Sequence, residues 1–332
     1  MIFYIEKKAK NLPQVKKILE KFPKAKILEI DNYKNLFDKK ISGTIGENIF
    51  ILAKLDSNPI TSAPPKYGHN GNAYFFKTSL NCIFDCSYCF LKGAFKNSYP
   101  VLFLNYEEIQ KKIEEKILEI KKENPNHETI RFYSSDYSDI QGFDFMSNFN
   151  ENFIKFFEKF ENVMMETRTK SANIENFLEI AKKGFVPKNT EIAFSLNPQS
   201  LIEKYEKKTA SLEARFSAIN KLLAKGFKVG LRFLPLLPVQ NYEEIYKKFL
   251  NEVKKNIPMD KIFSVFATGL LYTKEDYKKI LQKNPELDIL YQLQDGGDGF
   301  FREKEKIRKK FYEIFDEFHE KTIICLDEKN LI

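Results

Sequence analysis

Three of the four cysteines lie close together, in the segment Cys82-Ile-Phe-Asp-Cys86-Ser-Tyr-Cys89. A cubane iron–sulfur cluster needs thiolates that converge from one short loop, and a spacing of three and then two residues lets the chain reach three of its corners. The fourth iron is then open, so a ligand can chelate it through an amino and a carboxylate group. Cleavage of S-adenosylmethionine (SAM) requires this arrangement. The spacing therefore predicts a [4Fe–4S] cluster held by these cysteines, with SAM as the second cofactor.

Two other uses of the cysteines remain open. A structural zinc site takes four closed ligands, usually from paired knuckles. The remaining cysteine, Cys325, lies far along the chain, and the nearest histidine is His69. Three unrelated buried cysteines would need this spacing to arise by chance. The pattern favours the cluster, and an analysis of iron and sulfide would separate it from zinc.

The composition indicates an anionic partner and no membrane segment. The chain has 332 residues and a formal net charge of +8, from 54 Lys and Arg against 46 Asp and Glu. This excess favours nucleic acid, although a drift in codon usage would also raise the lysine content. No run of about 18 apolar residues occurs, and the segment MIFYIEKKAK lacks the apolar stretch of a secretory signal. We therefore expect a cytoplasmic protein with no membrane partner.

Strand-like and helical segments alternate from residue 73 onward. The strand-like runs, rich in β-branched and aromatic residues, are 73–79, 129–135, 162–169, 190–197, 228–235 and 261–269. Helical patterns occupy 105–122, 211–225 and 242–254, each with a capping residue at its start: Asn105, Ser211 and Asn241. Six such units predict an α/β fold in which a parallel sheet with right-handed crossovers forms a partial (β/α)6 TIM-like barrel.

Smaller units are expected at the two ends of the chain. A strand (2–5), a helix (12–22) and a strand (26–30) predict a small β-α-β unit over residues 1–60, followed by a proline- and glycine-containing linker. A helix (301–320) and a strand (322–327) extend the barrel unit, residues 61–332. The basic segment 301–310 could follow a phosphate backbone, but it also fits the solvated face of an amphipathic helix.

Polar residues at the carboxyl ends of the barrel strands are the candidates for binding SAM, because chemistry in such a sheet sits there. Asp136, with Ser134 and Ser135 before it, suits an ammonium group; it also fits a turn or a helix cap. Lys170 follows a strand and could pair with the SAM carboxylate. Arg168 lies on the same sheet face and is its rival, and either cation could instead be a solvated surface residue.

Two further groups of polar residues follow the same logic. Ser195 and Asn197 alternate on one face of a strand, where the ribose hydroxyls of SAM could satisfy them. The alternative is a core pair satisfied by the protein itself. Arg215 sits on a helix among apolar residues with Glu206 just upstream, which predicts a structural ion pair.

The cysteine spacing, with Tyr88 before the last cysteine, resembles the radical SAM superfamily signature, and the rest of the chain resembles the spore photoproduct lyase family more closely. The segments that carry this resemblance are DCSYCFLKG (85–93), METRTKS (165–171), FSLNP (194–198), the run 205–238, GGDGFFR (296–302) and IICLDE (323–328). Their shared order extends from about residue 45 to the C-terminus. The resemblance implies a partial barrel of the radical SAM type, with Tyr88 seating the adenine and Lys170 at the SAM carboxylate.

The same resemblance implies a reaction. SAM would be cleaved reductively to methionine and a 5′-deoxyadenosyl radical, which abstracts a hydrogen atom from the substrate. The favoured substrate is a UV-induced thymine photoproduct in DNA, flipped out of the duplex to reach the barrel mouth, so the enzyme would be a lyase in DNA repair. The electron would come from a one-electron reductant such as flavodoxin or ferredoxin.

Two residues depart from the family pattern. Asp136 stands where the lyases carry the cysteine that donates a hydrogen atom to the product radical, and Phe90 stands where they usually carry a second tyrosine. A carboxylate has no weak X–H bond to give. Tyr137 is the predicted replacement donor, because the loop after the strand leaves it free to turn inward, whereas strand alternation predicts that Tyr133 points away from Asp136.

These departures keep two rival functions open. The first is a radical SAM enzyme that acts on another substrate, such as RNA, a peptide or a small molecule. The second, of another class, is a nucleic-acid-binding protein that a metal holds together and that performs no chemistry.

Overall fold

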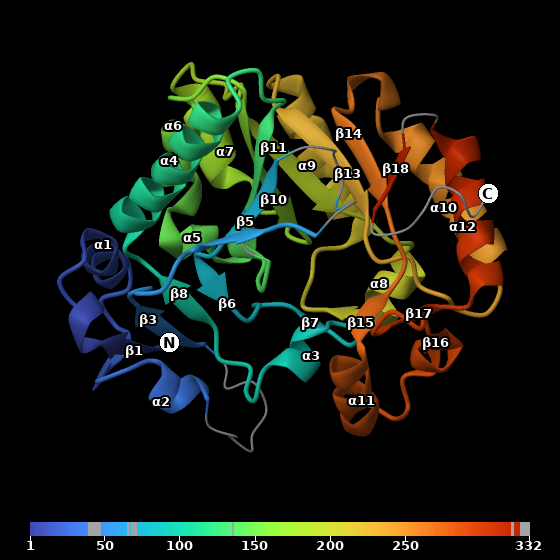
Figure 1. Cartoon of the computed structure of the whole chain (residues 1–332), viewed down its shortest axis with the longest axis horizontal. Coiled ribbons are helices and arrows are strands. Elements are labelled where there is room, and N and C mark those ends of the chain that lie inside the picture. Colours follow the sequence, from blue (N-terminus) through green and yellow to red (C-terminus); the bar gives the residue numbers. More distant parts are fainter. Residues whose placement is uncertain (39–47, 65–66, 68–71, 135, 320–321, 326–332) are drawn as a thin grey trace.

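The main sheet of the protein has eight strands, arranged nearly in chain order (Figure 1). The computed structural model describes residues 1–38, 48–64, 67, 72–134, 136–319 and 322–325. From one edge to the other the strands are β4 Ile60–Ser62, β5 Ala73–Phe76, β9 Ile130–Ser134, β10 Val163–Thr169, β11 Thr190–Ser195, β13 Lys228–Phe233, β14 Ser264–Ala267 and β18 Thr322–Ile324. All neighbours pair in parallel except β4 and β5.

The sequence prediction of six β/α units in a curled parallel sheet is confirmed. The principal crossover helices are α4 Tyr106–Glu123, α6 Phe149–Phe157, α7 Glu175–Lys182, α9 Leu212–Ala224, α10 Tyr242–Asn256 and α12 Glu305–Phe318. Each buries one apolar stripe; in α4 the stripe is Ile109, Ile113, Ile117 and Ile120. None of the helices in the described part of the chain is long and apolar enough to cross a membrane.

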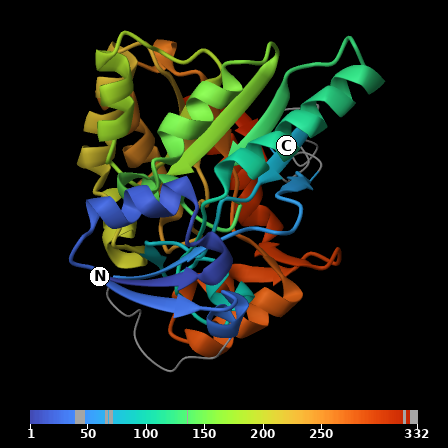
Figure 2. The same cartoon turned by 90° about the vertical axis from the view of Figure 1, so that its left-hand side faces the viewer.

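A second sheet of five strands contains the amino-terminal residues, which lie below the long strands of the main sheet in Figure 2. Its order is β2 Lys26–Ile30, β1 Ile2–Glu6, β3 Ile49–Ala53, β8 Val101–Phe103 and β6 Ser79–Leu80. The expected β-α-β start is present, with α1 spanning Pro13–Lys21. Two of the five strands come from beyond residue 60, and the division of the chain at that point stays a prediction.

Strand β6 connects the two sheets. The chain leaves the main sheet at Phe76, joins the second sheet at Ser79 and reaches Cys82 two residues after β6 ends. A short helix, α3 Leu91–Ala94, follows the cysteines. The cysteine loop is therefore fixed by both sheets.

The carboxyl-terminal region differs from the prediction of one helix over 301–320. Residues Phe300–Glu303 form strand β17, which pairs with β15 Leu271–Thr273 and β16 Leu293–Asp295, and α12 begins only at Glu305. Gly297 and Gly299 have positive φ angles of 80° and 94°, which allows the tight turn between β16 and β17. Helix α11, Lys274–Lys283, lies beside this small sheet. The last residues of the predicted strand 322–327 lie outside the described part of the chain.

The predicted helix caps are only partly confirmed. Ser211 caps α9 by accepting a hydrogen bond from the Ala214 amide. Asn105 does not cap α4, because its side-chain amide pairs with both backbone groups of Leu55. Asn241 precedes α10 with a φ angle of 58° and makes no capping bond with its side chain.

Charged side chains fill part of the interior of the main sheet. Arg232 on β13 is fully buried and binds Glu166 on β10 at 2.9 Å and Glu191 on β11 at 2.7 Å. Arg168 donates to Glu166, and Arg131 on β9 lies 3.8 Å from Glu191. We call these five residues the interior ion network. Sequence patterns did not predict it, because every pair except that of Arg168 and Glu166 joins different strands.

Removing Arg232 should strongly destabilise the protein. Arg232→Met leaves Glu191 with the Ser264 hydroxyl and, at 3.8 Å, with Arg131 as its remaining cation. Losing one partner of a buried pair costs about 3–5 kcal/mol. Urea or guanidinium unfolding would measure this loss. In the exposed pair of Lys182 and Glu179, Lys182→Met should leave the free energy of unfolding unchanged. Equal effects of the two changes would contradict a structural role for the network.

Candidate functional site

The cysteine loop is held in place by backbone pairing with a distant segment. Strand β7, Asp85–Cys86, pairs antiparallel with β12, Glu206–Lys207, so that Cys86 lies opposite Glu206. The amide of Ser87 donates to the carbonyl of Tyr205 at 2.8 Å. These bonds fix the direction of the loop.

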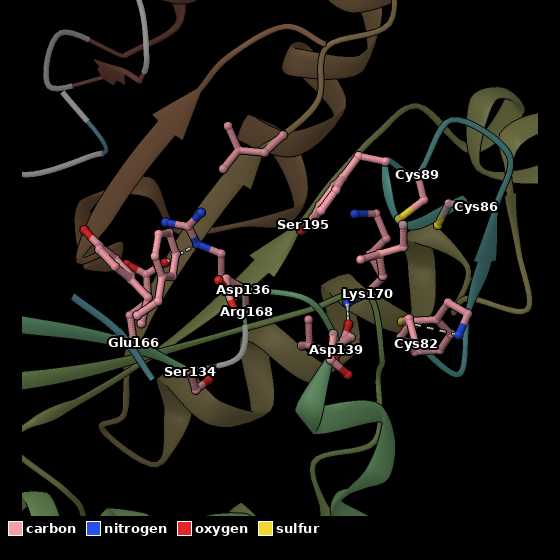
Figure 3. A pocket seen from close by; sticks show the side chains of 18 of the residues that line it. Cys82, Cys86, Cys89, Ser134, Asp136, Asp139, Glu166, Arg168, Lys170 and Ser195 are labelled. Atoms are coloured by element: carbon pink, nitrogen blue, oxygen red, sulfur yellow. Dashed lines mark hydrogen bonds and ion pairs between the residues drawn. The ribbon is translucent and has the colours of Figure 1, made fainter. Parts of the chain in front are cut away.

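The three thiols line one cavity of about 240 Å³, together with residues from the carboxyl ends of the neighbouring strands (Figure 3). Besides three tyrosines, its other polar residues are Ser134 at the end of β9, Asp136, Ser138 and Asp139 after it, Glu166, Arg168, Thr169 and Lys170 at the end of β10, and Ser195 at the end of β11. Residues from the ends of three neighbouring strands therefore line the same cavity as the cysteines, and the role of this cavity as the site stays a prediction. Cys325 does not line this cavity.

Burial and mutual repulsion keep the free thiols protonated. Burial raises the pKa of Cys86 to about 12, and it raises the pKa of Cys82 and Cys89 above the ordinary value. The charge of Cys89 further raises the pKa of Cys82 and of Cys86, so the thiols interact electrostatically. Because thiolates are the species that bind iron, loading this site must release protons.

Lys170 provides a positive charge at the cysteine end of the cavity. Its ammonium lies 5.9 Å from the centroid of the Tyr88 ring and makes no ion pair within the described residues. Burial opposes its charge, but Glu206 and Cys86 raise the pKa of Lys170 overall, so it stays protonated. Asp139 fixes its backbone by accepting from the Lys170 amide at 2.7 Å. The positioning role of Asp139 was not predicted.

Three polar atoms after β9 have no hydrogen-bond partner among the described residues. They are Ser134 Oγ, Asp136 Oδ1 and Ser138 Oγ, all buried against the cavity. Burial raises the pKa of Asp136, and the nearby Lys77 offsets this only in part. Buried polar groups left unpaired cost free energy unless a ligand satisfies them. Ser135, the other predicted SAM ligand here, lies outside the described residues.

The predicted cofactors fit these residues. Three thiols and a protonated lysine lie toward one end of the cavity, and unsatisfied carboxylate and hydroxyl oxygens line the same cavity. SAM offers a carboxylate for the lysine and an ammonium and hydroxyls for the oxygens. No group of three His, Cys, Asp or Glu side chains in the described ranges is close enough to hold a single metal ion.

Tyr88 is positioned by a buried carboxylate. Its hydroxyl donates to Glu206, which also accepts from Arg215 at 2.8 Å and from Asn197 at 2.9 Å. The predicted ion pair of Arg215 and Glu206 is confirmed, and both side chains are fully buried. Burial raises the pKa of Glu206, but the positive charges of Lys170 and Arg215 outweigh this effect and bring the pKa below its ordinary value.

The predicted pair of ribose ligands is divided by the structure. Ser195 lines the cavity, but Asn197 does not. The amide of Asn197 donates to Glu206, and its oxygen accepts from Tyr246 at 3.0 Å. Protein groups therefore satisfy Asn197, as the alternative expects, and a contact with SAM stays a prediction for both residues.

The two candidate tyrosines occupy different places. Tyr133 lines the cavity, as Asp136 does, so the prediction that the two side chains point apart is wrong. The chain turns after β9, which ends the strand alternation before Asp136. Tyr137 packs against Phe90 and Phe95, each at 5.8 Å between ring centroids, and does not line the cavity.

A curled parallel sheet with three cysteines in the loop after its first parallel strand is the architecture of a radical SAM protein. The chain matches the family model described as spore photoproduct lyase over residues 1–291. It therefore belongs to the spore photoproduct lyase family.

Individual relatives give the same picture at low identity. The chain is 25% identical over 189 residues to the spore photoproduct lyase of a Geobacillus species, and 27% identical over 209 residues to that of Clostridium acetobutylicum. These matches cover 55% and 63% of this chain, and 52% and 59% of the relatives. The matched region thus spans little more than half of the relatives' length.

Solved structures match over nearly the whole fold. A spore photoproduct lyase variant with bound AdoMet and dinucleoside spore photoproduct superposes with a TM-score of 0.80 and 20% identity, covering 97% of both chains. A spore photoproduct lyase complexed with the dinucleoside spore photoproduct gives a TM-score of 0.78 with the same coverage. At this identity the likeness shows the fold alone.

The cluster ligands can be tested by single substitutions. Anaerobically prepared protein should be brown, with about four irons and four sulfides per chain. Cys82→Ala, Cys86→Ala and Cys89→Ala should each abolish the colour and the binding of iron. Cys325→Ala should keep both, because Cys325 lies outside the cavity. The assignment is wrong if Cys325→Ala loses the cluster while one of the other three variants keeps it.

Proposed function

We propose that this protein is a radical SAM enzyme that acts on a thymine photoproduct in DNA. The observation that carries the proposal is the cavity at the strand ends, in which three thiols face Lys170 and unsatisfied oxygen atoms. Membership of the spore photoproduct lyase family supports the same conclusion. When bound, the cluster and SAM supply a 5′-deoxyadenosyl radical, which abstracts a hydrogen atom from the substrate.

Individual residues of the chain bind the cluster, bind SAM or position the residues that bind them. Cys82, Cys86 and Cys89 hold the cluster. Lys170 binds the carboxylate of SAM, and Asp136, with Ser134, binds its ammonium group. Asp139 positions Lys170 through its backbone, and Glu206 positions Tyr88 for the adenine. Ser195 binds a ribose hydroxyl.

The favoured substrate follows from the relatives and from charge. The matched solved structures contain a dinucleoside spore photoproduct, and the chain carries a formal net charge of +8. A lesion in duplex DNA has to be flipped out to reach a cavity of this kind. Phosphate contacts on the rim would make DNA binding weaken steeply with salt. The electron for the cluster would come from a one-electron reductant such as flavodoxin or ferredoxin. The proposed location of the protein is the cytoplasm.

A second candidate is a radical SAM enzyme for a different substrate, such as RNA, a peptide or a small molecule. The observations that favour it are Asp136, which stands at the position of the family's hydrogen-donating cysteine, and Phe90, which has no hydroxyl. A lyase with these residues needs another hydrogen donor. The remaining alternative is a nucleic-acid-binding protein that a metal holds together and that performs no chemistry. Such a protein would contain zinc and no labile sulfide.

The SAM ligands should respond separately from the cluster. Asp136→Asn and Lys170→Ala remove charge-assisted hydrogen bonds worth about 1.5–3 kcal/mol, so the affinity for SAM should fall about tenfold or more. Equilibrium binding of SAM to reconstituted protein measures this, and the iron content should stay unchanged. Lys182→Ala, which removes an exposed cation outside the cavity, is the control and should leave the affinity unchanged. If Asp136→Asn binds SAM normally, Asp136 is a turn residue only.

The substrate is tested by mixing reconstituted protein with SAM, dithionite and UV-irradiated DNA and identifying the products. Repair of the photoproduct requires a hydrogen donor for the product radical, and a tyrosine hydroxyl can serve. Tyr137 was the predicted donor, but the cavity lining favours Tyr133. Replacing the donor by Phe should divert the product to aberrant adducts while SAM cleavage continues; Tyr133→Phe and Tyr137→Phe therefore identify it. Cleavage of SAM with every photoproduct left intact would favour the second candidate.

A further inference from the structure

The cavity has a second end, away from the cysteines. Arg168 lies there, with the rings of Tyr67, Phe75 and Tyr133 around it (Figure 3 labels Arg168 and Glu166, away from the cysteines). The guanidinium carbon is 4.9 Å from the centroid of the Tyr67 ring and 5.1 Å from that of Tyr133. This end therefore combines a cation with flat apolar walls.

Arg168 has more hydrogen-bond donors than the protein uses. Its Nε donates to Glu166 and its Nη1 to the hydroxyl of Tyr67, both at 2.5 Å. Its Nη2 is buried and finds no acceptor in the described ranges. An arginine has five N–H donors, and leaving buried ones unpaired costs free energy. A ligand in the cavity would supply the missing acceptor.

The interior ion network has one cation more than it has anions. Arg131, Arg168 and Arg232 share the two carboxylates Glu166 and Glu191. Arg232 binds both carboxylates, so Glu166 only partly compensates the charge of Arg168. The partly compensated charge of Arg168 favours an electron-rich oxygen next to its guanidinium.

Lys170, and not Arg168, is the cation for SAM. The ammonium of Lys170 lies 5.9 Å from the centroid of the Tyr88 ring and beside the cysteines, whereas Arg168 lies away from them (Figure 3). Along β10, Arg168 lies two residues before Lys170, and its guanidinium is tied to Glu166 and Tyr67. Since SAM must reach the open iron, its carboxylate belongs with Lys170. Arg168 is therefore available to bind the substrate.

We propose that Arg168 binds the substrate directly, with its Nη2 donating to a carbonyl oxygen of a pyrimidine-2,4-dione ring. The ring lies in the pocket formed by Tyr67, Phe75 and Tyr133. This inference rests on the proposed function and adds the residue that recognises the base. A site that hydrogen-bonds a substrate carbonyl discriminates against rings that lack it.

The experiment measures equilibrium binding of two probes to anaerobically reconstituted protein: the dinucleoside spore photoproduct, and the same photoproduct with its bridging phosphate. Arg168→Met should weaken the binding of both probes about tenfold or more, because one charge-assisted hydrogen bond is lost from each. Its affinity for SAM should change by less than about twofold. Arg168→Lys keeps a cation beside Glu166 but cannot reproduce the guanidinium fork, so it should also weaken both probes.

The matched control is Arg131→Met. Arg131 belongs to the interior ion network but does not line the cavity. It should therefore leave the binding of both probes unchanged, and circular dichroism should confirm that each variant is folded. An equal loss in Arg131→Met would show that Arg168 acts only through the network, and would overturn the inference.

The other outcomes separate this inference from the function on which it rests. If Arg168→Met weakens only the phosphate-bearing probe, Arg168 recognises phosphate and the assignment to the ring fails. If it weakens SAM and neither probe, Arg168 is a SAM ligand and the inference fails while the proposed function stands. If the wild-type protein binds SAM but neither probe, the proposed thymine substrate fails, and the inference with it.

Discussion

The interior ion network is the constraint on which the arrangement of the site depends. Arg232 reaches Glu166 and Glu191 only when β10, β11 and β13 are in the register observed, in which Ser195 pairs with Arg232 and Arg168 with Ala193. A shift of one residue would turn these charges to the outer, helix-covered face, where they would lose their partners. A Cβ at position 230 would lie 2.2 Å from Glu191 Oε1. Glycine at this position therefore leaves the space that the Glu191 carboxylate occupies. The strand ends that carry Lys170 and Ser195 are thereby fixed relative to each other.

The cysteine loop depends on a second set of long-range contacts. It lies between the two sheets, and β12 fixes it from the opposite side. Glu206 contributes its backbone to the pairing with Cys86 and its carboxylate to the hydroxyl of Tyr88. One residue thus sets both the direction of the loop and the orientation of the aromatic ring between two of the cysteines.

Sequence patterns predicted what is local and missed what depends on register. The cysteine spacing, the six strands and the Ser211 cap each depend on residues that are close together in the sequence. The structure contains the strands and the cap at the predicted positions. Asn105 was expected to cap a helix but pairs with Leu55, which no short-range pattern reveals. The hydrogen bond from Tyr88 to Glu206 joins positions 118 residues apart. Tyr67 comes from a stretch that reads as a linker, and nothing in that stretch indicates a cavity residue.

The backbone pairing of β7 with β12 has a consequence for substitutions far from the cysteines. It joins the cysteine loop to a segment much later in the chain, so the position of Cys86 depends on residues that bind neither iron nor SAM. A change that shifts the register of β12 would move Cys86 relative to the other two cysteines while every ligand residue is kept.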